Sequence, residues 1–139
     1  MPNNVLYVCL GNSCRSIMAE ALTRHFYPDS VKTASAGMTP LGYIAEETLQ
    51  VLAEAGIATE GLRSKGLADI NLSEFRLLVN LSTYSLDALL PRAFQGKIIR
   101  HPVTDPFGRV LEVYRLTREA IRRFVIEELP RYFTHGSQS

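Results

Sequence analysis

A thiol and a guanidinium stand six positions apart near the start of the chain, in the run Cys9-Leu10-Gly11-Asn12-Ser13-Cys14-Arg15-Ser16. If this run curls around one centre, its backbone N–H groups converge where an oxyanion can bind. Arg15 can grip two oxygens of that anion with its planar fork of donors. The same positive field favours the thiolate form of Cys9. The pattern therefore predicts a nucleophilic cysteine aimed at a tetrahedral oxyanion such as phosphate.

The rest of the run should surround the anion and tune the sulfur. The residues that we expect to bind substrate are Leu10, Gly11, Asn12, Ser13, Cys14 and Ser16. Gly11 and Asn12 suit a loop that requires positive φ. Ser16 can donate a hydrogen bond to the thiolate, which stabilises the charged form; its other possible role is to cap the following helix.

Two further residues are candidates for supporting roles. Asn12 can bridge to a neighbouring strand and lock the loop backbone, with Ser35 as its candidate partner, although both could be ordinary loop residues. Cys14 could form a reversible disulfide with Cys9 and shield it from irreversible oxidation. The alternative for Cys14 is simple packing.

Strand-like and helix-like stretches alternate along the chain and must position these residues. The predicted strands cover residues 5–9, 31–36, 77–81 and 97–101. The first predicted helix covers residues 15–26, and its apolar stripe consists of Met18, Ala21, Leu22 and His25. The second covers residues 44–55 and ends at a Gly56 cap; the residues expected to face the sheet are Ala45, Leu49, Leu52 and Ala53. A short helix is predicted over residues 82–90, and a long last helix has an apolar seam of Val110, Tyr114, Ile121 and Val125. This alternation predicts an α/β fold with a doubly wound parallel sheet, as one domain over residues 1–139.

Asp105 is the candidate general acid. Pro106 restricts its backbone to extended geometry, and Pro102 and Gly108 keep it in a loop after the predicted fourth strand. Because ligands bind at the carboxyl ends of parallel strands, this loop should lie over the anion site. There Asp105 would protonate the leaving oxygen and later take a proton from water. The alternative is an ordinary turn-forming Asp-Pro pair.

Composition limits the other functions. The 15 Lys and Arg against 14 Asp and Glu leave a net charge of +1, which argues against a nucleic-acid or membrane-surface partner. No apolar run approaches the roughly 18 residues of a membrane-spanning helix, and residues 1–4 lack signal-peptide features, so we expect a cytoplasmic protein. The three histidines lack ligand spacing and both cysteines lie in one loop, so neither a metal, a cofactor nor a disulfide framework is expected.

The run CLGNSCRSIMAE resembles the phosphate-binding loop of the low-molecular-weight protein tyrosine phosphatases and of the thioredoxin-coupled arsenate reductases that share their fold. The segments Ser35-Ala36-Gly37, Ala55-Gly56-Ile57 and Asp105-Pro106-Phe107 resemble further motifs of that family in the same order, and the likeness covers nearly the whole chain. It implies a four-stranded sheet in the order 2-1-3-4, flanked by helices. It also implies hydrolysis of phosphotyrosine or related phosphomonoesters, on a phosphorylated protein or a small molecule, through a cysteinyl-phosphate intermediate.

Departures from the family bear on substrate choice. Leu41 stands where an aromatic wall of the phenyl slot is usual and Phe107 supplies the other wall, so the slot is half aromatic unless Tyr43 contributes. The segment 61–65 lacks the histidine that the family often carries there, which removes one expected buried polar link.

Arsenate reduction is the main alternative. Ser13 resembles the reductases more than the phosphatases, but Leu81-Ser82-Thr83 stands where their first relay cysteine would be. Arsenate chemistry would therefore need an external thiol reductant or glutaredoxin. A non-catalytic phosphate- or phosphopeptide-binding module is less consistent with the chain, because Cys9, Arg15 and Asp105 are all present.

Overall fold

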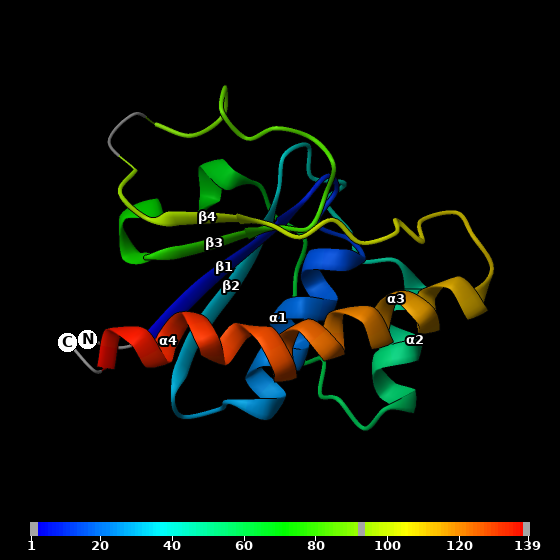
Figure 1. The fold of residues 1–139 in the computed structure, drawn as a ribbon. Helices are drawn as coiled ribbons and strands as arrows, with labels where there is room; N and C mark the ends of the chain where they lie inside the picture. Colours follow the sequence, from blue (N-terminus) through cyan, green and yellow to red (C-terminus); the bar gives the residue numbers. More distant parts are fainter. Residues whose placement is uncertain (1–2, 92–93, 138–139) are drawn as a thin grey trace.

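The computed structural model describes residues 3–91 and 94–137, which form an open parallel sheet with helices packed on it (Figure 1). The strands are β1 (Asn3–Cys9), β2 (Val31–Gly37), β3 (Leu77–Asn80) and β4 (Lys97–Arg100). All neighbouring strands are parallel, in the order β2-β1-β3-β4. The predicted α/β class and strand order are confirmed.

The helical elements follow the strands along the chain. They are α1 (Arg15–Phe26), α2 (Glu46–Glu54), the short 3-10 turns η1 (Leu67–Asp69) and η2 (Leu72–Glu74), α3 (Leu111–Arg123), a π-helical segment η3 (Phe124–Glu128) and α4 (Leu129–Ser137). The predicted bounds of α1 are confirmed.

The central strands are buried on both faces, as their continuous apolar sequences require. Val5 and Tyr7 of β1 join the apolar core formed with the α-helices, whereas Leu6 and Val8 join a second core on the opposite side. That second side is covered by the 3-10 turns and the loop after β3 rather than by long helices (Figure 1). At the carboxyl end of the sheet, β1 ends at Cys9 and the chain continues through residues 10–14 into α1.

The second helix is shorter than predicted. It begins at Glu46 because Ala45 is extended and its N–H donates to Ser13 in the cysteine loop. Its buried residues are Thr48, Val51 and Leu52. Two of the four residues predicted to face the sheet do not do so fully, since Ala53 is exposed and Leu49 is only half-buried. The predicted end is confirmed: Gly56 has a φ of 74°.

No helix forms over residues 82–90, where we predicted one. The Asn80 side chain accepts hydrogen bonds from the Ser82 N–H and hydroxyl and donates to the Tyr84 carbonyl. The Ser82 hydroxyl in turn accepts from the Tyr84 N–H. These local side-chain bonds compete with helical ones and hold a tight turn instead.

Two further placements differ from the predictions. Val110 is 71% exposed and precedes α3, whereas Tyr114, Ile121 and Val125 are buried as expected. His25 is exposed near the end of α1 rather than buried on its apolar stripe.

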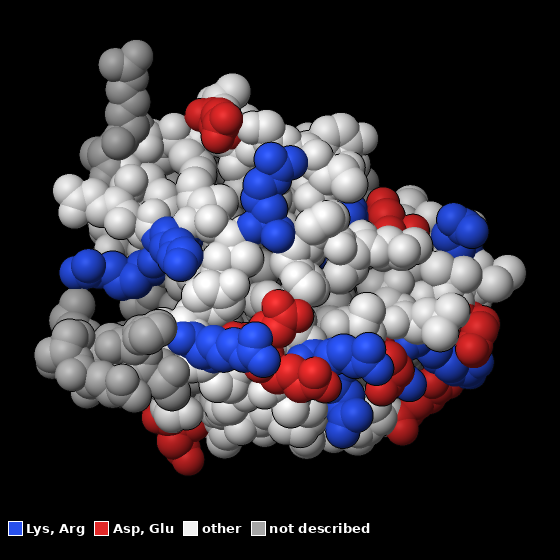
Figure 2. Space-filling model, viewed as in Figure 1, with Lys and Arg blue, Asp and Glu red and all other residues white. Residues whose placement is uncertain are grey.

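Ion pairs join α2 to α3, along which basic and acidic side chains alternate (Figure 2). Glu54 accepts two hydrogen bonds from the Arg115 guanidinium at 3.0 and 2.7 Å and a longer one from Arg118. These bonds, chiefly those from Arg115, hold the pKa of the Glu54 carboxyl below its ordinary value.

The pairing of Glu54 makes its contribution to stability dependent on pH. Its folded-state pKa is lowered, so the unfolded chain binds the proton more readily, and the contribution is present above the ordinary carboxyl pKa and lost as pH falls through the folded value. We expect Glu54→Gln to lower the melting temperature by about 2 °C at pH 7 and by clearly less at pH 3. Thermal melts at both pH values test this, and equal shifts would contradict it.

Candidate active site

The segment between β1 and α1 forms a ring whose carbonyl oxygens point outward. Backbone N–H groups of Met38, Thr39 and Leu41 donate to the carbonyl oxygens of residues 9, 10 and 11 at 3.0, 2.8 and 3.0 Å. The carbonyl of residue 13 accepts from the Ala45 N–H and the Thr48 hydroxyl. The loop after β2 and the first turn of α2 therefore hold the ring from outside.

The backbone N–H groups of the ring are available to donate hydrogen bonds to a ligand. Among the hydrogen bonds of the described residues, none is donated by the backbone N–H groups of residues 11–14. Asn12 has a φ of 49°, which asparagine tolerates well among residues with a side chain. The predicted positive φ at Gly11 is wrong. The absence of a side chain at Gly11 instead allows Leu41 to pack closely, because a Cβ there would lie 3.0 Å from the Leu41 Cγ. Gly37 likewise allows the ring backbone to approach closely, because a Cβ at this position would lie 2.9 Å from backbone atoms of the ring.

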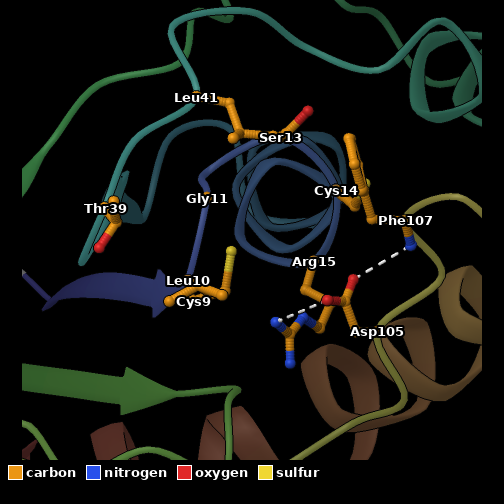
Figure 3. Close-up of a pocket in the computed structure, with 10 residues that line it drawn as sticks. All are labelled: Cys9, Leu10, Gly11, Ser13, Cys14, Arg15, Thr39, Leu41, Asp105 and Phe107. Atoms are coloured by element: carbon orange, nitrogen blue, oxygen red, sulfur yellow. Dashed lines mark hydrogen bonds and ion pairs between the residues drawn. The ribbon is translucent and has the colours of Figure 1, made fainter.

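Cys9 lies at the floor of the ring, with its sulfur directed toward the centre (Figure 3). The residue is only 2% exposed, so a substrate must enter deeply to reach it. The Ser16 hydroxyl lies 2.9 Å from the sulfur. Ser16 does not cap α1, because the position before the helix is Cys14 and no side chain caps it. The geometry thus favours the hydrogen bond to sulfur over the capping alternative.

Arg15 is 6% exposed and lies beside the ring. Its two terminal nitrogens contact the Leu81 and Val103 carbonyl oxygens at 3.4 Å and an Asp105 oxygen at 3.5 Å. Its Nε is buried and has no hydrogen-bond partner among the described residues. Because a buried donor without an acceptor is costly, this N–H suits an anion bound in the ring.

Asp105 reaches the ring from the loop after β4. One carboxylate oxygen accepts from the Phe107 N–H at 3.1 Å and the other faces Arg15 (Figure 3). The Thr117 hydroxyl of α3 donates to the Thr104 carbonyl and ties this loop to the helix. With 47% of its side chain exposed, Asp105 has access to both solvent and the cavity.

Asn12 and Ser35 are joined behind the ring. The Asn12 amide nitrogen donates to the hydroxyl oxygens of Ser35 at 3.0 Å and of Ser16 at 2.7 Å. Its amide oxygen accepts from the Lys65 backbone N–H at 2.8 Å. The segment 61–65 therefore does supply a buried polar link, through a main-chain group that residue types do not disclose.

Cys14 is buried in the core at 4% exposure, and both cysteines are free thiols. Burial raises the pKa of Cys14 to about 11, so it is a neutral thiol near pH 7. Its sulfur lies 3.9 Å from the Tyr114 hydroxyl. This surrounding fits the packing role; the disulfide with Cys9 stays a prediction.

A cavity of about 290 Å³ opens above the ring. Its lining includes both predicted walls, Leu41 and Phe107, which are each less than half exposed (Figure 3). Thr39 also lines it, which no pattern in the sequence indicated, whereas Tyr43 does not. One wall is aliphatic and the other aromatic.

Sequence reasoning also missed two charged residues behind the ring. Glu20 of α1 is 3% exposed and lies 3.7 Å from the Lys65 ammonium. A single acidic residue within the apolar run Ile17-Met18-Ala19-Glu20-Ala21-Leu22 was the signal that could have found it, because a buried charge needs a partner.

The described part of the chain shows neither a metal-binding cluster nor a helix that could span a membrane. No group of three His, Cys, Asp or Glu side chains within residues 3–91 and 94–137 is placed to hold a metal ion. No helix in those ranges is both long enough and apolar enough to cross a membrane.

An open parallel sheet whose first strand ends in an anion-binding cysteine loop defines a class of cysteine-dependent α/β phosphatase. Residues 4–127 match the family model described as low molecular weight phosphotyrosine protein phosphatase, and the chain belongs to this family of hydrolases.

Its relatives carry more than one activity in their names. The chain is 31% identical over 123 residues, 86% of its own length and 83% of the relative's, to the low molecular weight protein-tyrosine-phosphatase Wzb of Escherichia coli strain K12. It is 26% identical to the glutaredoxin arsenate reductase of a Synechocystis species, covering 87% of this chain and 92% of that one. The solved structure of the YwlE arginine phosphatase of Geobacillus stearothermophilus superposes with a TM-score of 0.84 at 26% identity, covering 99% and 97% of the two chains.

Proposed function

We propose that this chain hydrolyses phosphotyrosine or related phosphomonoesters through a cysteinyl-phosphate intermediate, with residues 1–139 acting as one domain. The observation that carries the proposal is that the Cys9 sulfur, directed toward the centre of the ring of N–H groups, shares one cavity with the Arg15 guanidinium and Asp105. Nucleophile, anion clamp and acid thus meet in one cavity.

In the first step, the Cys9 thiolate attacks phosphorus and forms an S–P bond while the P–O bond to the leaving group breaks. The ring N–H groups and Arg15 hold the non-bridging oxygens, whose charge they stabilise in the transition state. Asp105 transfers its proton to the leaving oxygen, which departs as a neutral alcohol or phenol.

In the second step, water attacks the phosphorus of the intermediate on the side that the leaving group vacated. Asp105, now a carboxylate, takes a proton from that water as the O–P bond forms. The S–P bond breaks, and the electron pair returns to sulfur as the thiolate. Inorganic phosphate then leaves. Asp105 now carries the proton that it took from water and can serve as the acid in the next cycle.

The depth of the sulfur supports a long, flat substrate side chain. Cys9 is 2% exposed at the bottom of the cavity, and Leu41 and Phe107 flank the entrance. A phenyl ring can fill the space between these walls while its phosphate reaches the ring. We infer that the partner is a phosphorylated protein or small phosphomonoester in the cytoplasm.

Arsenate reduction is the second candidate, because arsenate has the shape of phosphate and a relative of this chain is named glutaredoxin arsenate reductase. The described chain offers no third thiol, and both cysteines lie in the ring. Reduction of a Cys9–arsenic adduct would need two electrons from an external thiol reductant.

One comparative assay tests these functions. The purified protein is given a phosphotyrosine peptide, a protein carrying phosphoarginine, and arsenate with glutathione and glutaredoxin. We expect phosphate release from the phosphotyrosine peptide and no arsenite. Arsenite without phosphate release would move the assignment to the reductase, and faster release from phosphoarginine would change the substrate. No turnover in any arm would indicate a non-catalytic phosphate-binding module.

A further inference from the structure

Glu20 is a buried acidic residue that the steps above do not use. Its carboxylate accepts a hydrogen bond from the Ser35 hydroxyl at 2.6 Å. It is also paired with the Arg24 guanidinium and lies 3.7 Å from the Lys65 ammonium. Two cations thus pair with a carboxylate that is only 3% exposed, as expected because an unpaired buried charge would be very costly.

The charge of Glu20 sets the direction of the first hydrogen bond behind the ring. An ionised carboxylate can only accept, so the Ser35 hydroxyl must donate to it. The Ser35 oxygen is then an acceptor for the Asn12 amide nitrogen at 3.0 Å. The orientation of that amide is independently consistent, because its oxygen faces the Lys65 main-chain N–H, which can only donate.

The remaining bonds lead to the sulfur. With its oxygen occupied by Lys65, the Asn12 amide directs its second N–H to the Ser16 oxygen at 2.7 Å. An amide nitrogen accepts no hydrogen bond, so the Ser16 proton is free to point at the Cys9 sulfur, 2.9 Å away. Each donor in this network therefore has one direction.

We propose that Glu20 is a positioning residue that, through Ser35 and Asn12, holds the Ser16 hydroxyl as a donor to the Cys9 thiolate. The inference rests on the proposed function, in which that thiolate is the nucleophile. Lys65 and Arg24 support this role because they pair with the buried carboxylate of Glu20.

Loss of the Glu20 charge has two possible effects on the ionisation of Cys9, and they have opposite signs. The charged or titratable groups that face Cys9 are Arg15, Asp105 and Cys14 in the cavity, and Glu20 with its two cations lies behind them. Removing the negative charge of Glu20 would by Coulomb's law favour the thiolate. Releasing the Ser16 donor would disfavour it. The two effects move the ionisation of Cys9 in opposite directions.

The test is the pH profile of alkylation of Cys9 by iodoacetate, with the modified residue located by peptide mass spectrometry. Glu20→Gln keeps the size of the side chain but replaces one acceptor oxygen with an NH₂ donor. Because Arg24 binds the remaining oxygen, the Ser35 hydroxyl loses its acceptor. We expect the midpoint to move to higher pH and alkylation to slow about tenfold at pH values below it, with no change well above it. An unchanged profile, or a midpoint at lower pH, overturns the proposal.

A double-mutant cycle tests the route of the effect. Ser35→Ala removes the link between Glu20 and Asn12, so we expect it to move the profile in the same direction and Glu20→Gln to add nothing further in that background. Additive shifts would overturn the proposed route. If Glu20→Gln does not fold, Ser35→Ala alone tests the proposal, and an unchanged alkylation profile in that variant would overturn it.

Glu74→Gln is the matched control, because Glu74 also pairs with a lysine, Lys32, but on the surface and away from the ring. Its profile should match that of the parent. If the parent protein is not alkylated at Cys9 in preference to Cys14, or keeps its turnover after alkylation, the proposed function fails; a profile insensitive to Glu20 sinks only the present inference.

Discussion

Replacing Cys9 with serine should abolish turnover, with a loss of at least about 10⁴-fold in kcat. The serine hydroxyl occupies the same place but stays protonated near neutral pH, and within residues 3–91 and 94–137 no carboxylate or imidazole is hydrogen-bonded to this position to remove that proton. Ser16, the nearest polar side chain at 2.9 Å, is itself a hydroxyl. Steady-state hydrolysis of a phenyl phosphate measures the loss.

Binding provides the control for this substitution. In the proposed site the anion is held by the N–H groups of the ring and by Arg15, none of which changes in Cys9→Ser, so inorganic phosphate should bind at least as tightly as before. Isothermal titration calorimetry with phosphate tests this. Retention of more than a few per cent of the turnover would show that another group is the nucleophile, and loss of phosphate binding would show that the ring itself had changed.

Asp105→Asn should lower kcat by about 10²- to 10³-fold, the second-largest effect expected. The amide keeps the shape of the side chain and can still accept from the Phe107 N–H through its oxygen. It can neither give a proton to the leaving oxygen nor take one from water. Turnover should therefore lose the pH dependence that this acid and base imposes, as a pH series of kcat would show.

The same variant separates chemistry from binding. Asp105 lies 3.5 Å from Arg15, so removing its charge frees the guanidinium for an anion, and phosphate should inhibit the variant at least as well as the parent. Because the second step needs the base, the cysteinyl phosphate should accumulate and be visible by intact-protein mass spectrometry after an acid quench. Unimpaired turnover would contradict the acid and base role of Asp105 and favour the alternative that it only forms a turn with Pro106.

Local patterns predicted which side chains lie close together at the end of the first strand. Cys9, Arg15 and Ser16 belong to one strand, loop and helix start, so their relative placement depends on few backbone angles. The long-range placement of Asp105 followed from topology, because the loops after parallel strands meet at the same edge of the sheet.

Predictions failed where short-range and long-range forces compete. The stretch 82–90 has no helix because Asn80 and Ser82 satisfy nearby backbone groups with their side chains. Ala53 has an apolar side chain but faces solvent, since an apolar residue on a surface costs little and its type does not fix its direction.

The sequence by itself determined the fold class, the family and the identity of the thiol, guanidinium and carboxyl that meet in the cavity, because those depend on periodicity and on residue types in contiguous motifs. Only the tertiary structure decided what lies behind them: the Lys65 N–H on Asn12, the carboxylate of Glu20 on Ser35, and the outward carbonyl groups of the ring. These contacts join residues 15 to 53 positions apart, and main-chain donors have no signature in the residue types. Their partners become known only when the chain has packed, since each buried polar group must then find one.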